Sequence, residues 1–225
     1  MGTQISQNPK FYKSLLAWGL SKANSADESR IKLKNCSGYS SLGALKQALF
    51  SDLQGTVLEI GPGAGVNLSY YPNDIHWIGV EPNSFMHQYI QQQSEQFGFQ
   101  NIEIRNGSAE NLPVADNSID TVVSTYVLCS VNNVMGSLQE ILRVLKPGGQ
   151  FLFVEHVAAD CGSWSCRLQN GIEPIWKVMF DGCHPNRQTW LALENASFKS
   201  VDYRRFQVSF PIVSPHIAGV AIKAH

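Results

Sequence analysis

The 225-residue sequence lacks any apolar run of the length that crosses a membrane. A transmembrane helix needs about 20 consecutive apolar residues, and the N-terminal stretch at 14–20 is too short to span. That stretch also lacks the basic cluster and the small-residue cleavage site of a signal peptide. We therefore expect a soluble, cytoplasmic protein without an integral membrane segment.

The sequence also lacks an excess of charge and a paired set of cysteines. Its formal net charge is −1, whereas nucleic-acid binding usually requires a basic patch. Five cysteines are an odd number and fit a reducing compartment better than a secreted disulfide framework. No repeat or low-complexity tract divides the chain, and 44% of its residues are hydrophobic, which is enough for a core. We expect a single domain that is a monomer and that acts on a small molecule. We do not expect it to bind nucleic acid.

A glycine-rich turn follows the first clear strand signal. Residues 56–60 form a short, mostly apolar run, and Gly61, Gly63 and Gly65 follow at a spacing of two. Glycine tolerates positive φ and lets backbone N–H groups approach a ligand. Glu81 ends the next apolar run, twenty positions after Gly61, where an acid can accept hydrogen bonds from both ribose hydroxyls. The pattern predicts a nucleoside-binding turn.

The spacing within the turn bears on which nucleoside binds. Dinucleotide sites follow G-x-G-x-x-G, whereas the pattern here is G-x-G-x-G, with Glu59 two residues before the first glycine. A carboxylate at that place would repel a pyrophosphate but could bind the ammonium group of an amino-acid-bearing nucleoside. The pattern favours S-adenosylmethionine over NAD, although Glu59 could instead cap nearby backbone amides. The candidate binding residues of this stretch are Glu59, Gly61, Pro62, Gly63, Gly65 and Asn67.

Strand and helix signals alternate from residue 56 onward, which is typical of a parallel sheet with helices on both faces. We expect strands at 56–60, 76–81, 101–106, 119–125, 150–156, 199–208 and 216–223. Helices are expected at 65–70, 83–97 and 133–145, the last one stopped by Pro147-Gly148-Gly149. Only residues 209–215 join the last two strands, so these must pair antiparallel. The expected fold is α/β and Rossmann-like, with seven mostly parallel strands and the last strand reversed.

The segments on either side of this alternating region are expected to cover the site. Residues 8–51 look helical, with breaks, and apolar residues recur in them at helical spacing: Phe11, Leu15 and Trp18. They could form a helix buried on the domain or part of a lid that excludes water. Residues 164–180 indicate an amphipathic helix that is broken or kinked at Pro174. The single domain at 1–225 then comprises an N-terminal helical lid at 1–54, a cofactor-binding half at 55–157, and an acceptor-side insertion with the C-terminal antiparallel strands at 158–225.

Together, these features resemble the class I S-adenosylmethionine-dependent methyltransferases over about residues 55–223. The resemblance rests on the order and spacing of VLEIGPGAG, GVEPN, NGSAENLP, IDTVVSTYVLCSV and RVLKPGG. A narrower resemblance is to the methyltransferase-like 7 branch, known as thiol S-methyltransferases, and is carried by YVLCSV, FVEHVAA, FDGCHPNR, TWLALENASF and PHIAGVAIK. Animal members of that branch carry a hydrophobic N-terminal membrane anchor, and this chain has only the short run at 14–20. Membrane association is therefore not carried over.

The resemblance implies roles for residues at the strand ends. The glycines of the turn would line the methionine part of the cofactor, Glu81 would hold the ribose, and residues 108–110 would meet the adenine, although they could also form an ordinary turn. Ligands of open α/β sheets bind at the carboxyl ends of the strands, which adds the residues after the fourth strand. Beyond the turn itself, the candidate cofactor-binding residues are Glu81, Pro82, Ser108, Ala109, Glu110, Thr125, Tyr126 and Cys129.

Methyl transfer from a sulfonium places modest demands on the protein. The methyl group is already electrophilic, so the site mainly aligns an acceptor and excludes water, and a general base is optional. His156 directly follows the fifth strand and is the best candidate for contacting the substrate, or it could tie the strand end to a loop. Asp181 and His184 belong to an insertion expected to form a wall of the acceptor pocket, in which Asp181 could orient a basic group or cap a turn. The candidate catalytic residues are His156, Asp181 and Tyr126.

The cysteines are not expected to form a metal site. Their spacing is not that of a zinc knuckle, and cysteine is also a common buried hydrophobe, although their number raises the question of arsenite binding: Cys36, Cys129, Cys161, Cys166 and Cys183. The expected function is S-methylation of a small apolar thiol. The alternatives are O-, N- or C-methylation of another small metabolite, such as a quinone or lipid precursor, methylation of arsenite, and a catalytically silent cofactor-binding protein.

Overall fold

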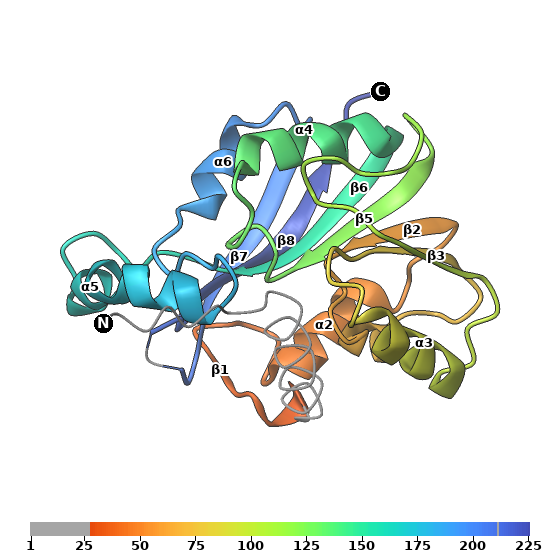
Figure 1. The fold of residues 1–225 in the computed structure, drawn as a ribbon. Helices are drawn as coiled ribbons and strands as arrows, with labels where there is room; N and C mark the ends of the chain where they lie inside the picture. Colours follow the sequence, from red (N-terminus) through yellow and green to blue (C-terminus); the bar gives the residue numbers. More distant parts are fainter. Residues whose placement is uncertain (1–27, 211) are drawn as a thin grey trace, which may run out of the picture.

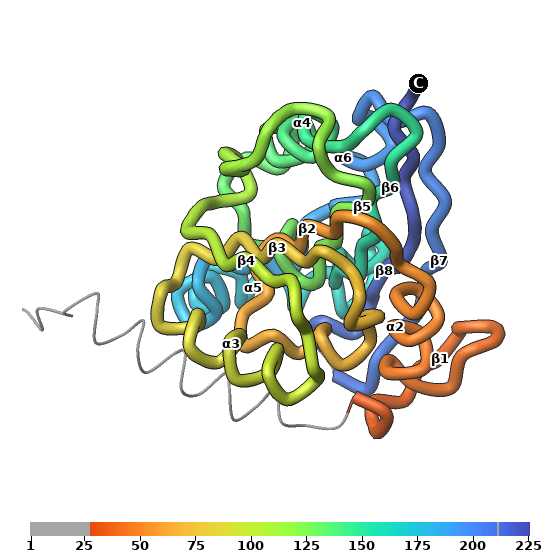
Figure 2. Tube along the Cα trace, turned by 90° about the vertical axis from the view of Figure 1, so that its right-hand side faces the viewer, coloured from red at the N-terminus to blue at the C-terminus, as the bar shows by residue number. Residues whose placement is uncertain are grey.

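A computed structural model describes residues 28–210 and 212–225 of the chain. These residues form one eight-stranded sheet in the order β1-β7-β8-β6-β5-β2-β3-β4, and helices cover both of its faces (Figures 1 and 2). The expected apolar helix face of Phe11, Leu15 and Trp18, and with it the first half of the predicted lid, lies outside the described residues.

The strands and helices alternate along the chain as the sequence predicted. The strands are β1 (Leu33–Lys34), β2 (Thr56–Ile60), β3 (His76–Val80), β4 (Ile102–Arg105), β5 (Ile119–Thr125), β6 (Leu145–His156), β7 (Ser200–Val208) and β8 (Pro215–Ile222). The α-helices are α2 (Leu42–Phe50), α3 (His87–Gln96), α4 (Val134–Val144), α5 (Trp164–Met179) and α6 (Thr189–Asn195), and short 3₁₀ turns lie at η1 (Glu28–Arg30) and η2 (Val66–Tyr70).

The sheet topology places the carboxyl ends of four central strands at one edge. β2 pairs in parallel with β3 and β5, and β5 pairs in parallel with β6. β8 is antiparallel to both β6 and β7, which confirms the reversed last strand. Since connections between parallel strands run from the carboxyl end of each strand, the loops after β2, β3, β5 and β6 meet at one edge of the sheet.

Two apolar cores lie on the two faces of the sheet. Side chains of successive strand residues point to opposite faces, so that in β6 Phe151 and Phe153 join one core while Leu152 and Val154 join the other. The first core is covered by α4 and α6, and the second by α2, η2 and α3, in agreement with the two views of the ribbon. The alternating arrangement makes the sheet a rigid support for the loops at its edge.

The structure corrects two of the predicted boundaries. Residues 33–34 form β1, paired antiparallel with β7, rather than part of a helix, so the sheet has one strand more than predicted. β6 begins at Leu145, before Pro147, rather than at residue 150. The residue before a proline disfavours helical backbone dihedral angles. Helix α4 accordingly ends at Val144, ahead of Pro147.

Helix α5 also differs from its prediction. It runs without a break over Trp164–Met179 with Pro174 inside it, whereas we expected a broken or kinked helix. A proline in a helix removes one backbone hydrogen bond to the carbonyl four residues earlier. That carbonyl belongs to Asn170, which is exposed, so water can hydrate it. Among the described residues, no helix is both long and apolar enough to cross a membrane.

A buried polar network lies beneath the glycine turn. The Glu59 carboxylate on β2 accepts hydrogen bonds from the Asn67 side-chain amide at 2.7 Å and from the Trp77 indole N–H at 3.2 Å. The same Asn67 amide donates to the Thr125 hydroxyl at 2.9 Å. Burial raises the pKa of Glu59 from 4.5 to about 7, against the opposing effect of these donors. The network therefore joins η2 to β2, β3 and β5 through the Glu59 carboxyl group and the Asn67 amide.

We predict that Gly219→Ala destabilises the fold by about 1–3 kcal/mol, the range of overpacking in a well-packed core. A Cβ on Gly219 of β8 would lie 2.6 Å from the Cα of Tyr203 on β7, so the two strands must move apart. The matched control is Gly171→Ala on α5, where a Cβ meets nothing within 4 Å and alanine favours the helix by up to about 1 kcal/mol. Urea unfolding measures both, and equal stabilities of the two variants would contradict the packing of β7 against β8.

We also predict a pH-dependent stability that depends on Glu59. The pKa of Glu59 is raised in the folded protein, so between pH 4.5 and about 7 the folded protein holds this proton more tightly than the unfolded chain does. The resulting contribution to the free energy of unfolding is complete below about pH 4.5 and is lost as the pH rises to about 7. Relative to Glu59→Gln, which does not titrate, the wild-type free energy of unfolding should fall by roughly 3 kcal/mol across this interval. Urea unfolding at a series of pH values measures the difference. Parallel pH profiles for the two proteins would contradict it.

Candidate functional site

The glycine turn leaves an open space at the carboxyl end of β2. Gly61, Gly63 and Gly65 all have positive φ, between 57° and 79°, the region that favours glycine. A Cβ on Gly61 would lie 2.8 Å from a methyl of Val127, and one on Gly65 would lie 3.1 Å from a methyl of Leu68, but one on Gly63 would meet nothing within 4 Å. A side chain at Gly63 would therefore enter open space rather than meet protein atoms.

Glu81 closes this cavity from the end of β3. Its carboxylate is buried and accepts hydrogen bonds from the backbone N–H groups of Gly63 at 3.0 Å and Asn83 at 2.8 Å. Burial raises the pKa of Glu81, while the two N–H donors act in the opposite direction. The carboxylate thus links the loops after β2 and β3 and borders the space in front of Gly63.

We call this space the glycine-loop cavity. It has a volume of about 380 Å³. Eight of the predicted cofactor-binding residues line it: Gly61, Gly63, Glu81, Pro82, Ser108, Ala109, Glu110 and Tyr126. The sequence reasoning missed other lining residues, namely Asn83 and Met86 after β3, Val127, Ser130, Val131 and Asn132 after β5, and Phe180 at the end of α5.

The remaining predicted cofactor-binding residues lie outside this lining. Glu59, Asn67 and Thr125 form the buried network beneath the turn, and Glu59 bonds to protein groups there. Pro62 accepts a hydrogen bond at 2.9 Å from the N–H of Gly65, so these two residues shape the turn itself. The sixth residue, Cys129, lines a neighbouring cavity instead.

The turn after β5 is held from two sides. The buried Glu155 of β6 accepts hydrogen bonds at 3.1 Å from the N–H groups of Val127 and Leu128, and at 2.8 Å from the hydroxyl of Ser124. Arg187, which precedes α6, donates to the carbonyl oxygens of Leu128 and Val131, both at 2.7 Å. We call residues 126–131 the clamped turn. Neither contact partner was identified from the sequence, although both lie in its quoted motifs FVEHVAA and FDGCHPNR.

The clamped turn separates the glycine-loop cavity from a second cavity of about 890 Å³. Tyr126, Ser130 and Phe180 line both spaces. Because Trp176, Phe180 and Phe210 contribute aromatic walls to the second space, we call it the aromatic cavity; its other lining residues include Leu42, Val208, Val213 and His216. Trp176 and Phe180 stack with their ring centroids 4.1 Å apart. The insertion after β6 contributes Trp176, Phe180 and Cys183 to the wall of this cavity.

Two histidines at the ends of paired strands lie in the aromatic cavity. His156 of β6 and His216 of β8 are register partners, both buried. Burial lowers the pKa of His216 to about 4, and its Nδ1–H donates to the carbonyl oxygen of Ser214 at 3.0 Å. The Nδ1 atom of His156 is buried without a partner among the described residues, and its Nε2 atom lies 3.0 Å from the sulfur of Cys183. His156 thus lines the aromatic cavity, and its contact with a substrate stays a prediction.

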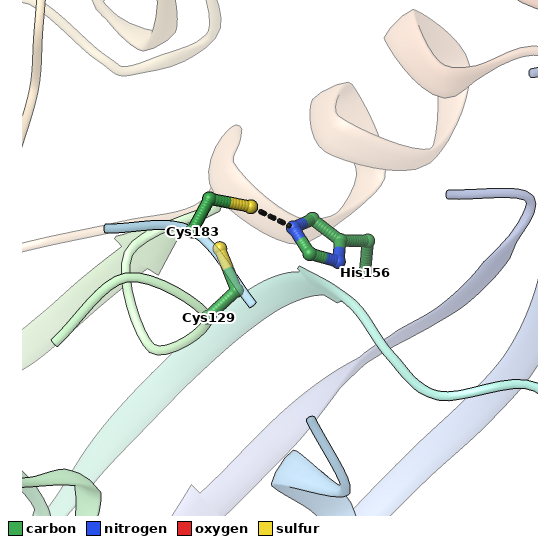
Figure 3. A group of neighbouring side chains, drawn as sticks. All are labelled: Cys129, His156 and Cys183. Atoms are coloured by element: carbon green, nitrogen blue, oxygen red, sulfur yellow. Dashed lines mark hydrogen bonds between the residues drawn. The ribbon is translucent and has the colours of Figure 1, made fainter. Parts of the chain in front are cut away.

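Cys129, His156 and Cys183 form a compact cluster from three separate segments (Figure 3). Their two sulfurs and one imidazole nitrogen all lie within 4.8 Å of one another. The pKa of Cys183 is lowered to about 4, chiefly by a hydrogen bond from the Cys129 thiol and further by His156 and the Trp176 indole. The pKa of Cys129 is raised, chiefly by its hydrogen bond to Cys183 and further by burial. The cysteines that seemed scattered in the sequence thus include one pair that meets.

The two insertion residues expected in a wall of the acceptor pocket, Asp181 and His184, do not line the aromatic cavity. Asp181 lines the glycine-loop cavity rather than the aromatic cavity, and its charge contributes to raising the pKa of Glu81. His184 pairs with Glu173 of α5 at 2.8 Å. The reason is the end of α5, where Asp181 and Gly182 both take positive φ and turn the chain back, so that Asp181 points to the first cavity and Cys183 to the second.

Comparisons with known proteins support a single family. Residues 58–153 match a family described as a methyltransferase domain. Human thiol S-methyltransferase TMT1A is 38% identical over 196 residues, which are 81% of this chain and 80% of that protein. Human thiol S-methyltransferase TMT1B is 36% identical over 191 residues, 79% and 78% of the two chains.

Solved structures show the same fold at lower sequence identity. The crystal structure of YcgJ from Bacillus subtilis matches with a TM-score of 0.64 at 18% identity, covering 82% of this chain and 98% of that one. The cyclase SpnF matches with a TM-score of 0.70 at 17% identity, covering 96% and 94%. Since identities of 36–38% extend over about four fifths of this chain and the sheet has the topology that the motifs predicted, the chain belongs to the class I S-adenosylmethionine-dependent methyltransferases.

Proposed function

We propose that this methyltransferase transfers the methyl group of S-adenosylmethionine to the sulfur of a small apolar thiol. The observation that carries the proposal is the aromatic cavity, which adjoins the glycine-loop cavity at the shared residues Tyr126, Ser130 and Phe180. Its aromatic walls suit an apolar acceptor, because apolar surface is stabilised where water is excluded. The thiol S-methyltransferase relatives at 36–38% identity support sulfur as the accepting atom.

The glycine-loop cavity fits the cofactor. Gly63 offers a backbone N–H beside open space, and the Glu81 carboxylate can accept hydrogen bonds from two ribose hydroxyls. Ser108 and Ala109 border the same cavity on the side of the loop after β4, where small residues allow an adenine ring to approach. When bound, S-adenosylmethionine supplies an electrophilic sulfonium methyl group. The residues proposed to hold it are Gly61, Gly63, Glu81, Pro82, Ser108, Ala109 and Glu110.

The contribution of the chain to the reaction is mainly alignment and exclusion of water. Well-oriented reactants can lower a barrier by roughly 7–11 kcal/mol. A free thiol has a pKa of about 8.5, so a few per cent is thiolate at neutral pH. A group that removes the thiol proton, or that stabilises the thiolate, raises this fraction. In the aromatic cavity His156 is the candidate for this role, and Tyr126, at the border of both cavities, is the candidate for positioning the acceptor.

We predict that Glu81→Gln weakens binding of S-adenosylhomocysteine by about 10- to 100-fold, because hydrogen bonds to a charged acceptor contribute roughly 1.5–3 kcal/mol. The amide has nearly the same size as the carboxylate but replaces one acceptor oxygen with a donor, so the N–H group of Gly63 or of Asn83 also loses its acceptor. Glu95→Gln on the exposed face of α3 removes a carboxylate away from the cavity and serves as the matched control. Isothermal titration calorimetry gives both affinities, and wild-type affinity in Glu81→Gln would overturn the ribose assignment.

We predict that the purified protein forms S-adenosylhomocysteine with a small apolar thiol, and not with a phenol or an amine of similar size. Mass spectrometry of the product measures the reaction.

Trp176→Ala, which opens the aromatic wall, should raise the KM for the thiol by ten- to two-hundredfold, since a lost apolar contact in a pocket is worth roughly 1–3 kcal/mol. Trp164→Ala is the control, because that indole lies on α5 but is 73% exposed.

The acceptor panel separates the proposal from its alternatives. Turnover of the phenol or the amine without turnover of the thiol would replace sulfur with oxygen or nitrogen as the accepting atom. Binding of S-adenosylmethionine without turnover of any acceptor would contradict the thiol assignment in favour of another metabolite or a silent cofactor-binding protein.

A further inference from the structure

The cluster of Cys129, His156 and Cys183 brings together three ligand atoms that the sequence keeps apart. Cys129 lies in the clamped turn after β5, His156 ends β6, and Cys183 follows α5. All three side chains are buried and all three line the aromatic cavity. Figure 3 shows both sulfurs and the Nε2 side of the imidazole directed toward a common point.

The chemistry of these donors selects a soft or borderline cation. Two sulfurs and one imidazole nitrogen suit zinc, whereas magnesium and calcium require oxygen ligands. Zinc binds sulfur at about 2.3 Å and imidazole nitrogen at about 2.0–2.1 Å, so tetrahedral ligand atoms lie about 3.5–3.8 Å apart. The three ligand atoms of the cluster already lie within 4.8 Å of one another. The Nε2 atom of His156 and the sulfur of Cys183 are 3.0 Å apart, so this pair lies slightly closer than two zinc ligands do.

The surroundings of the cluster suit a metal with one open position. Three protein ligands of tetrahedral zinc leave a fourth position for water or substrate, and the aromatic cavity supplies space beside the cluster. The nearby buried carboxylate of Glu155 accepts hydrogen bonds from Ser124, Val127 and Leu128 through Oε1, and its Oε2 atom has no hydrogen-bond partner among the described residues.

We propose that Cys129, His156 and Cys183 bind a zinc ion whose fourth position takes the sulfur of the acceptor thiol. On binding, the S–H bond breaks, its electron pair stays on sulfur and forms the bond to zinc, and the proton leaves to solvent. A thiol that coordinates zinc is deprotonated outright, so the ion supplies the thiolate that a free thiol provides only in part at neutral pH. The inference deepens the proposed function and rests on it for the identity of the acceptor.

Cobalt substitution tests the metal site directly. The purified full chain is treated with chelator, transferred to metal-free buffer and titrated with Co²⁺, and the near-ultraviolet sulfur-to-cobalt charge-transfer band and the visible bands of tetrahedral cobalt are recorded. We expect one Co²⁺ per chain, displaced by Zn²⁺. Cys129→Ser and Cys183→Ser should each weaken the charge-transfer band and reduce Co²⁺ affinity at least tenfold. Cys166→Ser on α5, outside the cluster, is the control and should match the wild type.

The outcome that overturns the metal site is equally specific. A chain without a sulfur-to-cobalt band, or a band that is the same in the wild type and both cluster variants, would exclude it. Circular dichroism of each variant shows whether the fold is retained, and His156→Gln provides a third variant that keeps both cysteines. It should retain the charge-transfer band with lower affinity, and unchanged affinity would remove His156 from the ligand set.

A second measurement separates this inference from the proposed function. Adding a small apolar thiol to the cobalt-loaded protein should increase the charge-transfer absorption, whereas a phenol of similar size should not. An unchanged spectrum would contradict binding of the thiol to the metal. If the metal-free protein methylates thiols at the full rate, the proposed function stands and the zinc inference fails. If the spectrum responds to the thiol but no thiol is methylated, the metal site stands and the thiol methyltransferase assignment fails.

Discussion

The geometry of the site depends on the way Glu155 and Arg187 hold the clamped turn. The buried carboxylate of Glu155 accepts hydrogen bonds from two backbone N–H groups of the turn. The guanidinium of Arg187 donates hydrogen bonds to two carbonyl oxygens of the same turn. Hydrogen bonds to charged groups are stronger than those between neutral groups, so the turn is fixed from both sides. Tyr126 is held with a φ of 60° at the border of the two cavities, and Cys129 is held near His156.

The two cavities use different parts of the chain. The glycine-loop cavity is built mainly on the ends of parallel strands, where the positions of Gly63 and Glu81 are set by the sheet itself. The walls of the aromatic cavity come from several separate parts of the chain, which include residues 30–32, the clamped turn, the end of α5 with the turn that follows it, and the segment between β7 and β8. On the proposed function, cofactor binding is tied to the common fold, whereas acceptor choice depends on segments outside the parallel strands.

The sequence predicted the features that depend on local patterns. The alternation of strands and helices, the glycine turn and the acid after β3 are each written in a few adjacent residues, and the structure confirms the fold that they indicate. The meeting of Cys129 with Cys183 is set instead by the reversal of the chain after α5, which no local pattern contains. Glu155 was likewise overlooked, because a charged residue in a strand gives no sign of which loop it will bind.

The most direct test of this account is a crystal structure of the protein with S-adenosylhomocysteine and a small apolar thiol. The account predicts the nucleoside in the glycine-loop cavity with its ribose at Glu81, and the thiol in the aromatic cavity with its sulfur beside Cys129, His156 and Cys183. The clamped turn should keep its conformation, with Tyr126 between the two ligands. A thiol bound outside the aromatic cavity, or a nucleoside that does not contact Glu81, would contradict the account.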